Sequence, residues 1–385
     1  MKSYFVYGYF GNNNIGDELI LAGFLKALFS KAPDAGKVIV SSKLSGNEFL
    51  RYYENSFPDR EIEFTDRSRN PLSISNLAGI LKTECFVVPG GGIFQDYGIL
   101  SFLCYFSQAA FAKFLGKKVF LLYQGFTGIK RRFFKNVMRW GIKNLFDYVS
   151  VRDKFSFERY LKKAGSGLPV SASLYSDLVF ILSAELKNSM PPDDEAYCDS
   201  GTIGFAFRSW KGFSGKDMAS CVEKVIDSTG LKAVLYPMQY PDDLELNNEI
   251  MKSVSERNKN NVAAAEFCPD PVSFFKSVGR NRFNIGMRFH FSVLSAIAKV
   301  PCIGISYDDK VLEFYREANL PEFCVTLDGV KAAADIASEV AAKIKLAGVN
   351  YFAISKNLLQ YSDMKEEVSG KLFDEFIREM AVLIK

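Results

Sequence analysis

The sequence predicts an α/β protein with two parallel sheets, each covered by helices on both faces. Short apolar runs alternate along the chain with longer helical stretches, which is typical of parallel sheets. The 385 residues exceed what one hydrophobic core usually serves, so two domains are expected. The chain is 48% hydrophobic and 24% charged, which is the composition of a globular protein.

The first half of the chain repeats one pattern of strand, loop and helix. Residues 4–7 predict a strand, the loop GNNNIGD follows, and residues 18–29 predict a helix. The same order recurs after predicted strands at residues 38–41, 85–88, 119–123 and 148–151. We therefore expect residues 1–184 to form an N-terminal Rossmann-like domain.

A second series begins beyond residues 185–200, whose prolines and acidic residues predict an interdomain linker. New strands are predicted at residues 202–208, 232–236, 283–287 and 301–305. Residues 201–350 thus predict a C-terminal Rossmann-like domain, and residues 351–385 a helix that packs back on the first domain. Two doubly wound domains are expected to face a ligand cleft, as in the GT-B glycosyltransferases.

Composition argues against several kinds of partner and site. The 48 basic and 44 acidic residues give a net charge of +4, too small an excess to indicate nucleic acid as a partner. The seven cysteines are scattered without a CxxC pair and the chain has one histidine, so we expect no metal and no cofactor. The longest apolar region, residues 102–126, is interrupted by polar and lysine side chains and is not expected to cross a bilayer. We expect a cytoplasmic protein with free thiols.

Two loops that follow predicted strands carry candidate ligand-binding residues. The loop at residues 11–17 opens a helix, whose free N–H groups favour an anion or sugar hydroxyls. Asn14 and Asp17 are its candidates, although a plain turn with Asp17 as helix cap explains the pattern equally well. Three adjacent glycines in the loop PGGGIFQD allow a ligand to approach the backbone, whereas tight packing explains only one glycine. The candidates in this loop are Gly91, Gly92, Gln95 and Asp96.

Two further loops follow the next predicted strands. Gln124 begins the loop QGFTG, a weaker signal of the same kind. Arg152 stands where the strand at residues 148–151 ends, and a guanidinium there can bind carboxylate or phosphate through two parallel bonds. The alternative is a surface ion pair with Asp153, which contributes little to stability. The position at a strand end favours a functional role for Arg152.

The densest signal lies in residues 286–311, which contain Arg288, His290 and Lys310. A lone histidine is more often structural than catalytic, but His290 follows a predicted strand and has two basic residues nearby. Three potential cations without an obvious acidic partner suit a small dianionic ligand.

The sequence resembles the polysaccharide pyruvyl transferase family from the first loop to Val311. The matching segment GMRFHFSVLSAIAKVPCIGISYDDKV is long and specific, and the other matching segments are short but occur in the family's order and spacing. The sequence departs from the family pattern at Pro89, at Phe94 and in GFTGIK after Gln124, changes that we expect to affect the acceptor more than the donor. The matching segments are GYFGNNNIGDELIL, VVPGGGIFQD, YQGFTG, SVRDKFS, SDLVF, YPMQ and GMRFHFSVLSAIAKVPCIGISYDDKV.

The resemblance implies phosphoenolpyruvate as donor and two hydroxyls of one sugar, in a glycan or lipid-linked saccharide, as acceptor of a cyclic pyruvate ketal. Such products belong to cell-wall polysaccharides and exopolysaccharides. His290 is the implied acid, acting on the methylene carbon or on the leaving phosphate. Arg152 and Lys310 would complete the catalytic set by holding the donor's anionic groups, with Arg288 as a weaker donor-binding candidate. The implied acceptor-binding residues are Asn14, Asp17, Gly91, Gly92, Gln95, Asp96 and Gln124.

Two other functions fit the same architecture. A sugar-nucleotide glycosyltransferase should carry acidic residues for ribose near the C-terminal strand ends, where this sequence has basic ones. A glycan-binding protein without catalytic activity has no need for a proton donor. The basic aromatic segment at residues 130–140 predicts either contact with an anionic inner-membrane surface or a solvated helix with an apolar inner face.

Overall fold

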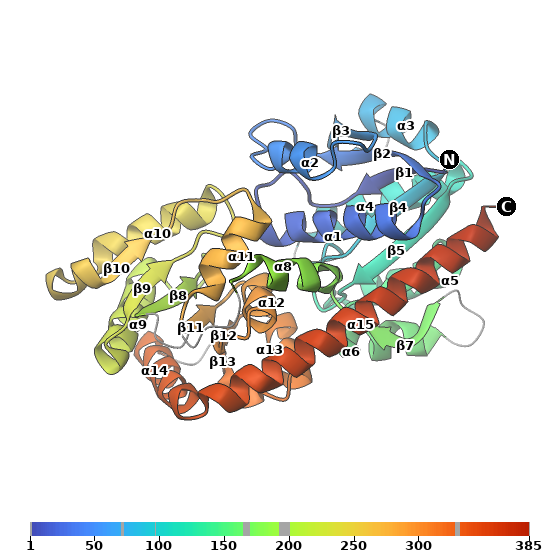
Figure 1. Cartoon of the computed structure of the whole chain (residues 1–385). Coiled ribbons are helices and arrows are strands. Elements are labelled where there is room, and N and C mark those ends of the chain that lie inside the picture. The colour runs from blue at the N-terminus through green and yellow to red at the C-terminus, as the bar shows by residue number, and fades with distance from the viewer. Residues whose placement is uncertain are drawn as a thin grey trace. The chain divides into compact units, whose positions relative to one another are not determined.

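The computed structural model describes residues 2–70, 73–96, 98–164, 170–191, 201–327 and 332–384. The chain divides into two compact units, each built around a parallel sheet with helices (Figure 1). Unit 1 comprises Met1–Asn12, Asp17–Ile181 and Lys365–Lys385, and unit 2 comprises Asn13–Gly16 and Leu182–Met364. The predicted class, an α/β fold with two doubly wound parts, is confirmed.

Unit 1 contains a parallel seven-stranded sheet in the order β3-β2-β1-β4-β5-β6-β7. The order reverses between β1 and β4, where Val6 pairs with Val87. At such a switch point the loops that follow the two strands diverge and leave room for a ligand. The strands are β1 (Lys2–Tyr7), β2 (Ala35–Ser42), β3 (Ile62–Asp66), β4 (Cys85–Pro89), β5 (Lys118–Gln124), β6 (Tyr148–Val151) and β7 (Val170–Tyr175).

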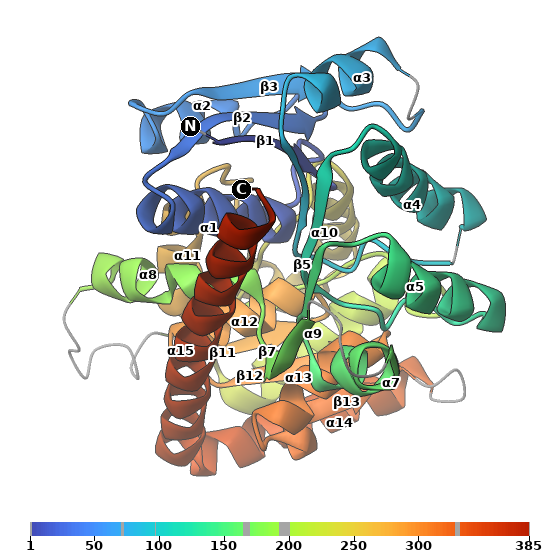
Figure 2. The same cartoon turned by 90° about the vertical axis from the view of Figure 1, so that its right-hand side faces the viewer.

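Helices cover both faces of the unit 1 sheet (Figure 2). On one face, buried aromatic side chains of the sheet and of α4 and α5 form a core that includes Phe86, Phe102 and Phe134. The other face carries α1 and the second half of the C-terminal helix. The helices are α1 (Ile15–Lys31), α2 (Leu50–Ser56), α3 (Ile74–Leu81), α4 (Ile99–Phe114), α5 (Arg132–Asn144), α6 (Lys154–Ser156), η1 (Phe157–Leu161), α7 (Lys162–Ala164) and η2 (Leu178–Leu182).

The C-terminal helix α15 (Tyr351–Leu383) contributes its first half to unit 2 and its second half to unit 1. In unit 1 the Phe376 ring lies 5.2 Å from the Phe120 ring and 6.1 Å from the Tyr148 ring, measured between centroids. The Tyr123 hydroxyl donates to the Ser369 carbonyl at 2.6 Å. Apolar packing and this hydrogen bond thus hold the end of the chain against the sheet.

Unit 2 contains a parallel six-stranded sheet in the order β10-β9-β8-β11-β12-β13. Because β8, β11 and β12 are neighbours, with Gly286 paired to both Ala206 and Gly304, their carboxyl ends meet on one edge of the sheet. The strands are β8 (Thr202–Ala206), β9 (Lys232–Leu235), β10 (Val262–Ala264), β11 (Phe283–Gly286), β12 (Cys302–Ser306) and β13 (Cys324–Thr326).

Helices also flank the sheet of unit 2, where α9 and α14 pack against each other. The prediction of a linker at residues 185–200 is wrong at its start, because residues 185–189 continue the helix α8; residues 192–200 lie outside the described part of the chain. The helices are α8 (Ser183–Ser189), α9 (Gly215–Thr229), α10 (Asp242–Ser253), η4 (Glu256–Asn261), α11 (Pro271–Gly279), α12 (Phe289–Ile297), α13 (Asp309–Glu317), η5 (Pro321–Phe323) and α14 (Ala333–Val349).

Candidate active site

His290 lies in the first turn of α12, just beyond the carboxyl end of β11. A methyl group added to Gly16 would lie 2.0 Å from His290 Nδ1, so only glycine leaves room for the imidazole at this point. Gly16 lies in the predicted first loop but is not among the predicted site residues. Its contact with His290 gives this glycine a steric reason that the sequence alone did not reveal.

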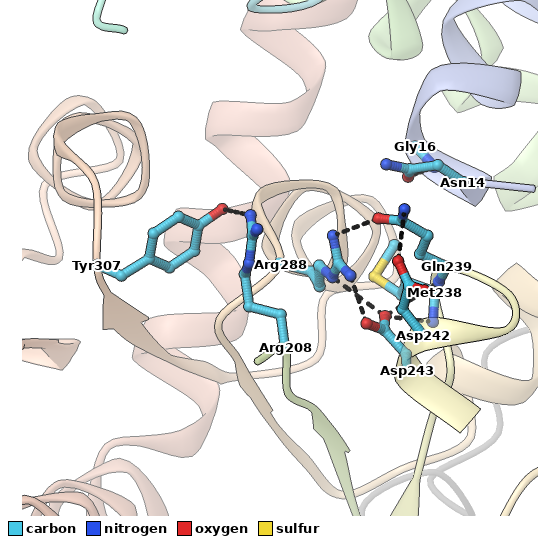
Figure 3. Close-up of polar contacts among 9 residues, drawn as sticks. All are labelled: Asn14, Gly16, Arg208, Met238, Gln239, Asp242, Asp243, Arg288 and Tyr307. Carbon is cyan, nitrogen blue, oxygen red and sulfur yellow. Dashed lines mark hydrogen bonds and ion pairs between the residues drawn. The ribbon is translucent and has the colours of Figure 1, made fainter. Parts of the chain in front are cut away.

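The segment Asn13–Gly16 is held within unit 2 by backbone hydrogen bonds. Ile15 N donates to the Met238 carbonyl at 2.9 Å, and Tyr240 N donates to the Asn13 carbonyl at 3.0 Å. The Asn14 side chain accepts from Gly16 N at 3.1 Å, which shapes the turn before α1 (Figure 3). Asn14 therefore belongs to the unit that contains His290, whereas Asp17 belongs to unit 1.

Arg288 has an acidic partner, Asp243. The expectation that the three cations of residues 286–311 lack an acidic partner is therefore wrong for Arg288. Its Nε donates to Asp243 Oδ2 at 3.1 Å, its Nη2 contacts Asp243 Oδ1, and its Nη1 donates to Gln239 Oε1 at 3.1 Å (Figure 3). Asp243 is 1% exposed and also accepts from the backbone N–H groups of Met238 and Gln239. Through these contacts Arg288 and Asp243 hold the loop after β9 in place. The role of Arg288 in donor binding stays a prediction.

Lys310 lies in the first turn of α13, close to two residues that are not among the predicted site residues. Its Nζ lies 5.4 Å from the centroid of the Tyr307 ring. Arg208 Nη1 donates to the Tyr307 hydroxyl at 2.8 Å (Figure 3). Arg208 follows the end of β8 by two residues, the same spacing as Arg288 after β11, so the strand-end criterion applied to Arg152 points to it as well.

In unit 1, Arg152 is buried at the carboxyl end of β6, with 4% of its surface exposed. Its Nε lies 3.3 Å from Asp153 Oδ2, and Asp153 in turn accepts from Ser156 N at 2.8 Å. A methyl group added to Gly125 would lie 2.4 Å from Arg152 Nη2. The pair with Asp153 is thus buried, and the guanidinium lies directly against the loop after β5.

Two of the glycines after β4 have a backbone reason, and Gly90 has a steric one as well, because a methyl group added there would lie 2.5 Å from Ile20 Cγ2. Gly90 and Gly91 have φ angles of 63° and 85°, in the left-handed region that favours glycine. A methyl group at Gly92 would come within 4.0 Å of Arg152 Nη1, and one at Gly91 within 3.9 Å of Asp17 Oδ1. The loop after β4 therefore lies between Asp17 and Arg152 within unit 1.

The predicted polar residues of these loops make hydrogen bonds to the loops themselves. Gln124 is fully buried, and its amide donates to the carbonyls of Val88, Gly90 and Leu122. Asp96 is buried and accepts from the backbone N–H groups of Lys130 and Arg131, before α5. Gln95 donates to the Gly92 carbonyl. These residues shape the loops, and their contact with an acceptor stays a prediction.

The segment at residues 130–140 has an apolar inner face and an aromatic outer one. Phe134 and Met138 of α5 are buried, whereas Phe133 is 68% exposed and Trp140 is 56% exposed. Contact with a membrane surface and the cytoplasmic location stay predictions. In the described ranges we find no helix long and apolar enough to cross a membrane, and no group of three His, Cys, Asp or Glu side chains placed to hold a metal ion.

Comparison with known proteins gives a family and a fold. A family model described as polysaccharide pyruvyl transferase matches residues 14–309, most of the chain. A search of curated protein sequences found no significant match.

Several solved structures share the fold of the chain. The S. aureus MnaA structure with UDP superposes with a TM-score of 0.61 at 13% identity, covering 93% of this chain and 91% of that one. The UDP-GlcNAc 2-epimerase of Neisseria meningitidis gives 0.60 at 11% identity, covering 93% and 94%. That of Methanocaldococcus jannaschii gives 0.58 at 13% identity, covering 90% and 93%. At such identities the likeness establishes a GT-B-like architecture and nothing about the substrate.

Proposed function

Because the chain belongs to the polysaccharide pyruvyl transferase family, we propose that it transfers the enolpyruvyl group of phosphoenolpyruvate to two hydroxyls of one sugar. The product is a cyclic pyruvate ketal on a glycan or a lipid-linked saccharide, and phosphate is released. The observation that carries this proposal is the family match over residues 14–309, which includes Arg152 and His290 and ends one residue before Lys310.

The reaction requires one proton donor and a site that tolerates two anionic groups. Protonation of the methylene carbon gives a methyl group and an oxocarbenium-like centre, which the first sugar hydroxyl attacks. The bond from this carbon to the phosphate oxygen then breaks, and the second hydroxyl closes the ring. Of the two protons that the hydroxyls lose, one balances the proton taken up by carbon and the other leaves with phosphate.

His290 is the proton donor in this scheme. It is the chain's one histidine, and histidine exchanges protons readily near neutral pH. The fit of its imidazole against Gly16 supports a defined ring orientation, which a general acid needs. Lys310 and Arg152 would bind the donor's phosphate and carboxylate. Asp17, with the loops that contain Gly91, Gln95, Asp96 and Gln124, would bind the acceptor sugar.

A nucleotide sugar is the alternative donor, because the structural neighbours include proteins solved with UDP or UDP-GlcNAc. The first experiment therefore measures phosphate release from phosphoenolpyruvate across a panel of hexose and N-acetylhexosamine glycosides, with UDP-sugars in parallel. Acceptor-dependent phosphate release, with the ketal detected by mass spectrometry, is the expected result. Turnover of a UDP-sugar without phosphoenolpyruvate would contradict the proposal.

Replacement of His290 tests its role as the acid. We expect His290→Ala to lower turnover by about a hundredfold to ten-thousandfold, the usual span for losing a general acid, with a much smaller effect on donor binding. His290→Gln keeps a hydrogen-bond donor but cannot deliver a proton, so it should be as slow as His290→Ala. Near-normal turnover of the Gln variant, with an unchanged thermal unfolding midpoint, would mean that His290 only positions the donor.

A further inference from the structure

Two side chains outside the predicted site lie beside Lys310 at the carboxyl edge of the unit 2 sheet. Arg208 follows β8 and Tyr307 follows β12, and these strands are separated only by β11, which leads to His290. Arg208 Nη1 donates to the Tyr307 hydroxyl at 2.8 Å, and the guanidinium carbon lies 4.6 Å from the centroid of the Tyr307 ring (Figure 3). The Trp210 ring, 4.7 Å from the Tyr307 ring, packs against this pair.

Among the residues that the structure describes, the positive charges of Arg208 and Lys310 lack acidic partners. In the part of the chain that the structure describes, neither Arg208 nor Lys310 forms an ion pair with a carboxylate, whereas Arg288 is paired with Asp243. Arg208 Nε is also buried without a hydrogen-bond partner among the described residues. Two neighbouring cations without acidic partners favour an anionic ligand at this position.

The Tyr307 hydroxyl adds a third donor. Its oxygen accepts from Arg208, so its own proton remains available to an acceptor. Burial acts to raise the pKa of Tyr307, but the charges of Lys310, Arg208 and Arg288 outweigh it, and the pKa of the phenol is lowered from its ordinary value. A phenol in such surroundings is a stronger hydrogen-bond donor to an oxyanion.

We propose that Arg208 and Tyr307, together with Lys310, bind the phosphate group of the donor. A guanidinium, an ammonium and a phenol provide one donor for each of the three terminal oxygens of a phosphate monoester, whereas a carboxylate has two oxygens. This inference rests on the proposed function for the identity of the donor. It assigns Arg208 and Tyr307 to binding and leaves proton transfer to His290.

The test is calorimetric binding of inorganic phosphate, phosphoenolpyruvate and pyruvate to the full chain at low and high salt. Arg208→Gln should raise the Kd for phosphate and for phosphoenolpyruvate by about tenfold to a hundredfold, and Tyr307→Phe by about twofold to tenfold. Pyruvate binding should change little. The loss should shrink at high salt, because charge supplies the affinity.

Arg257→Gln is the matched control, because Arg257 is exposed and precedes β10, at the opposite edge of the sheet. It should bind phosphate as the wild type does. Arg208→Lys keeps the charge but lacks the planar guanidinium group, so its Kd for phosphate should lie between those of the wild type and Arg208→Gln. If thermal unfolding shows that Arg208→Gln does not fold, Arg208→Lys and Tyr307→Phe still decide the question.

The results separate this inference from the proposed function. Wild-type affinity of the Arg208 and Tyr307 variants for phosphate overturns the inference, even if the enzyme turns over phosphoenolpyruvate. Weaker binding of pyruvate with unchanged binding of phosphate also overturns it, because the cluster then binds the carboxylate. Phosphate binding that depends on Arg208 supports the site even if no sugar accepts a pyruvyl group, an outcome that would count against the proposed function alone.

Discussion

Glu18 is a fully buried carboxyl group in the first turn of α1. It accepts from Gly11 N at 2.7 Å and from the Tyr53 hydroxyl at 2.7 Å, and so ties the first loop to α2. Burial raises the pKa of Glu18 to about 7 from its ordinary value of 4.5, and these two hydrogen bonds only partly oppose the increase. The folded state therefore retains this proton over a pH range in which the unfolded chain has lost it.

The sign of the pH effect follows from the proton count. Between about pH 4.5 and pH 7 the folded state binds more protons at Glu18, so the free energy of unfolding falls as the pH rises, by up to about 3 kcal/mol. Glu18→Gln cannot ionise, so it should remove this slope and be more stable than wild type at pH 8. Denaturant unfolding from pH 4.5 to 8 measures the effect, with the exposed Glu54→Gln on α2 as control. An unchanged slope in Glu18→Gln would contradict the prediction.

Strand-end positions were predictable from the sequence, whereas hydrogen-bond partners were not. The apolar runs locate the ends of β6 and β11, so Arg152 and His290 were expected beyond the carboxyl ends of these strands and lie there. Asp243 is 45 positions from Arg288, and no local pattern indicates that the two side chains meet. The contact between Gly16 and His290 likewise joins distant parts of the chain.

At the scale of elements, Arg288 pairs with Asp243 in the first turn of α10 and donates to Gln239, and so joins the loop after β11 to the loop that precedes α10. Removal of one member of a buried pair leaves the other charged group without its partner. We expect Arg288→Met to cost about 3–5 kcal/mol of stability, and the double variant Arg288→Met with Asp243→Asn to cost clearly less than the sum of the two single changes. Trp210 fluorescence in a Trp140→Phe background follows the unfolding of unit 2, because the chain has only these two tryptophans.

The exposed pair of Arg257 and Asp227 is the matched control for this cycle, with side chains 68% and 45% exposed. Its coupling should be at most about 1 kcal/mol. Additive effects at Arg288 and Asp243 would mean that the buried pair is not the link between these loops. The sequence predicted both loops and the helices after them, but the second part of α8, residues 185–189, fell within the predicted linker because prolines and acidic residues further along gave the stronger signal.

At the scale of the whole molecule, unit 1 is built from segments that are far apart in the sequence. The repeated strand and helix pattern predicted the N-terminal part of unit 1, and the helix at the C-terminus was predicted as well. What periodicity cannot show is how the buried face of α15 fits the sheet. Leu372, Phe373 and Phe376 are fully buried in unit 1, next to side chains from the first 150 residues such as Phe24 and Phe120.

Phe376→Ala should therefore destabilise unit 1 although it lies nine residues from the end of the sequence. Loss of a buried phenylalanine side chain typically costs about 3–5 kcal/mol, because the transfer free energy is lost and a cavity remains. Phe352, in the first half of the same helix, is 78% exposed, so Phe352→Ala should change stability by less than about 0.5 kcal/mol. Trp140 fluorescence in a Trp210→Phe background reports on unit 1. If both phenylalanine variants unfold at the wild-type denaturant concentration, the C-terminal segment contributes nothing to unit 1; if only Phe376→Ala is weakened, unit 1 requires the end of α15 for its stability.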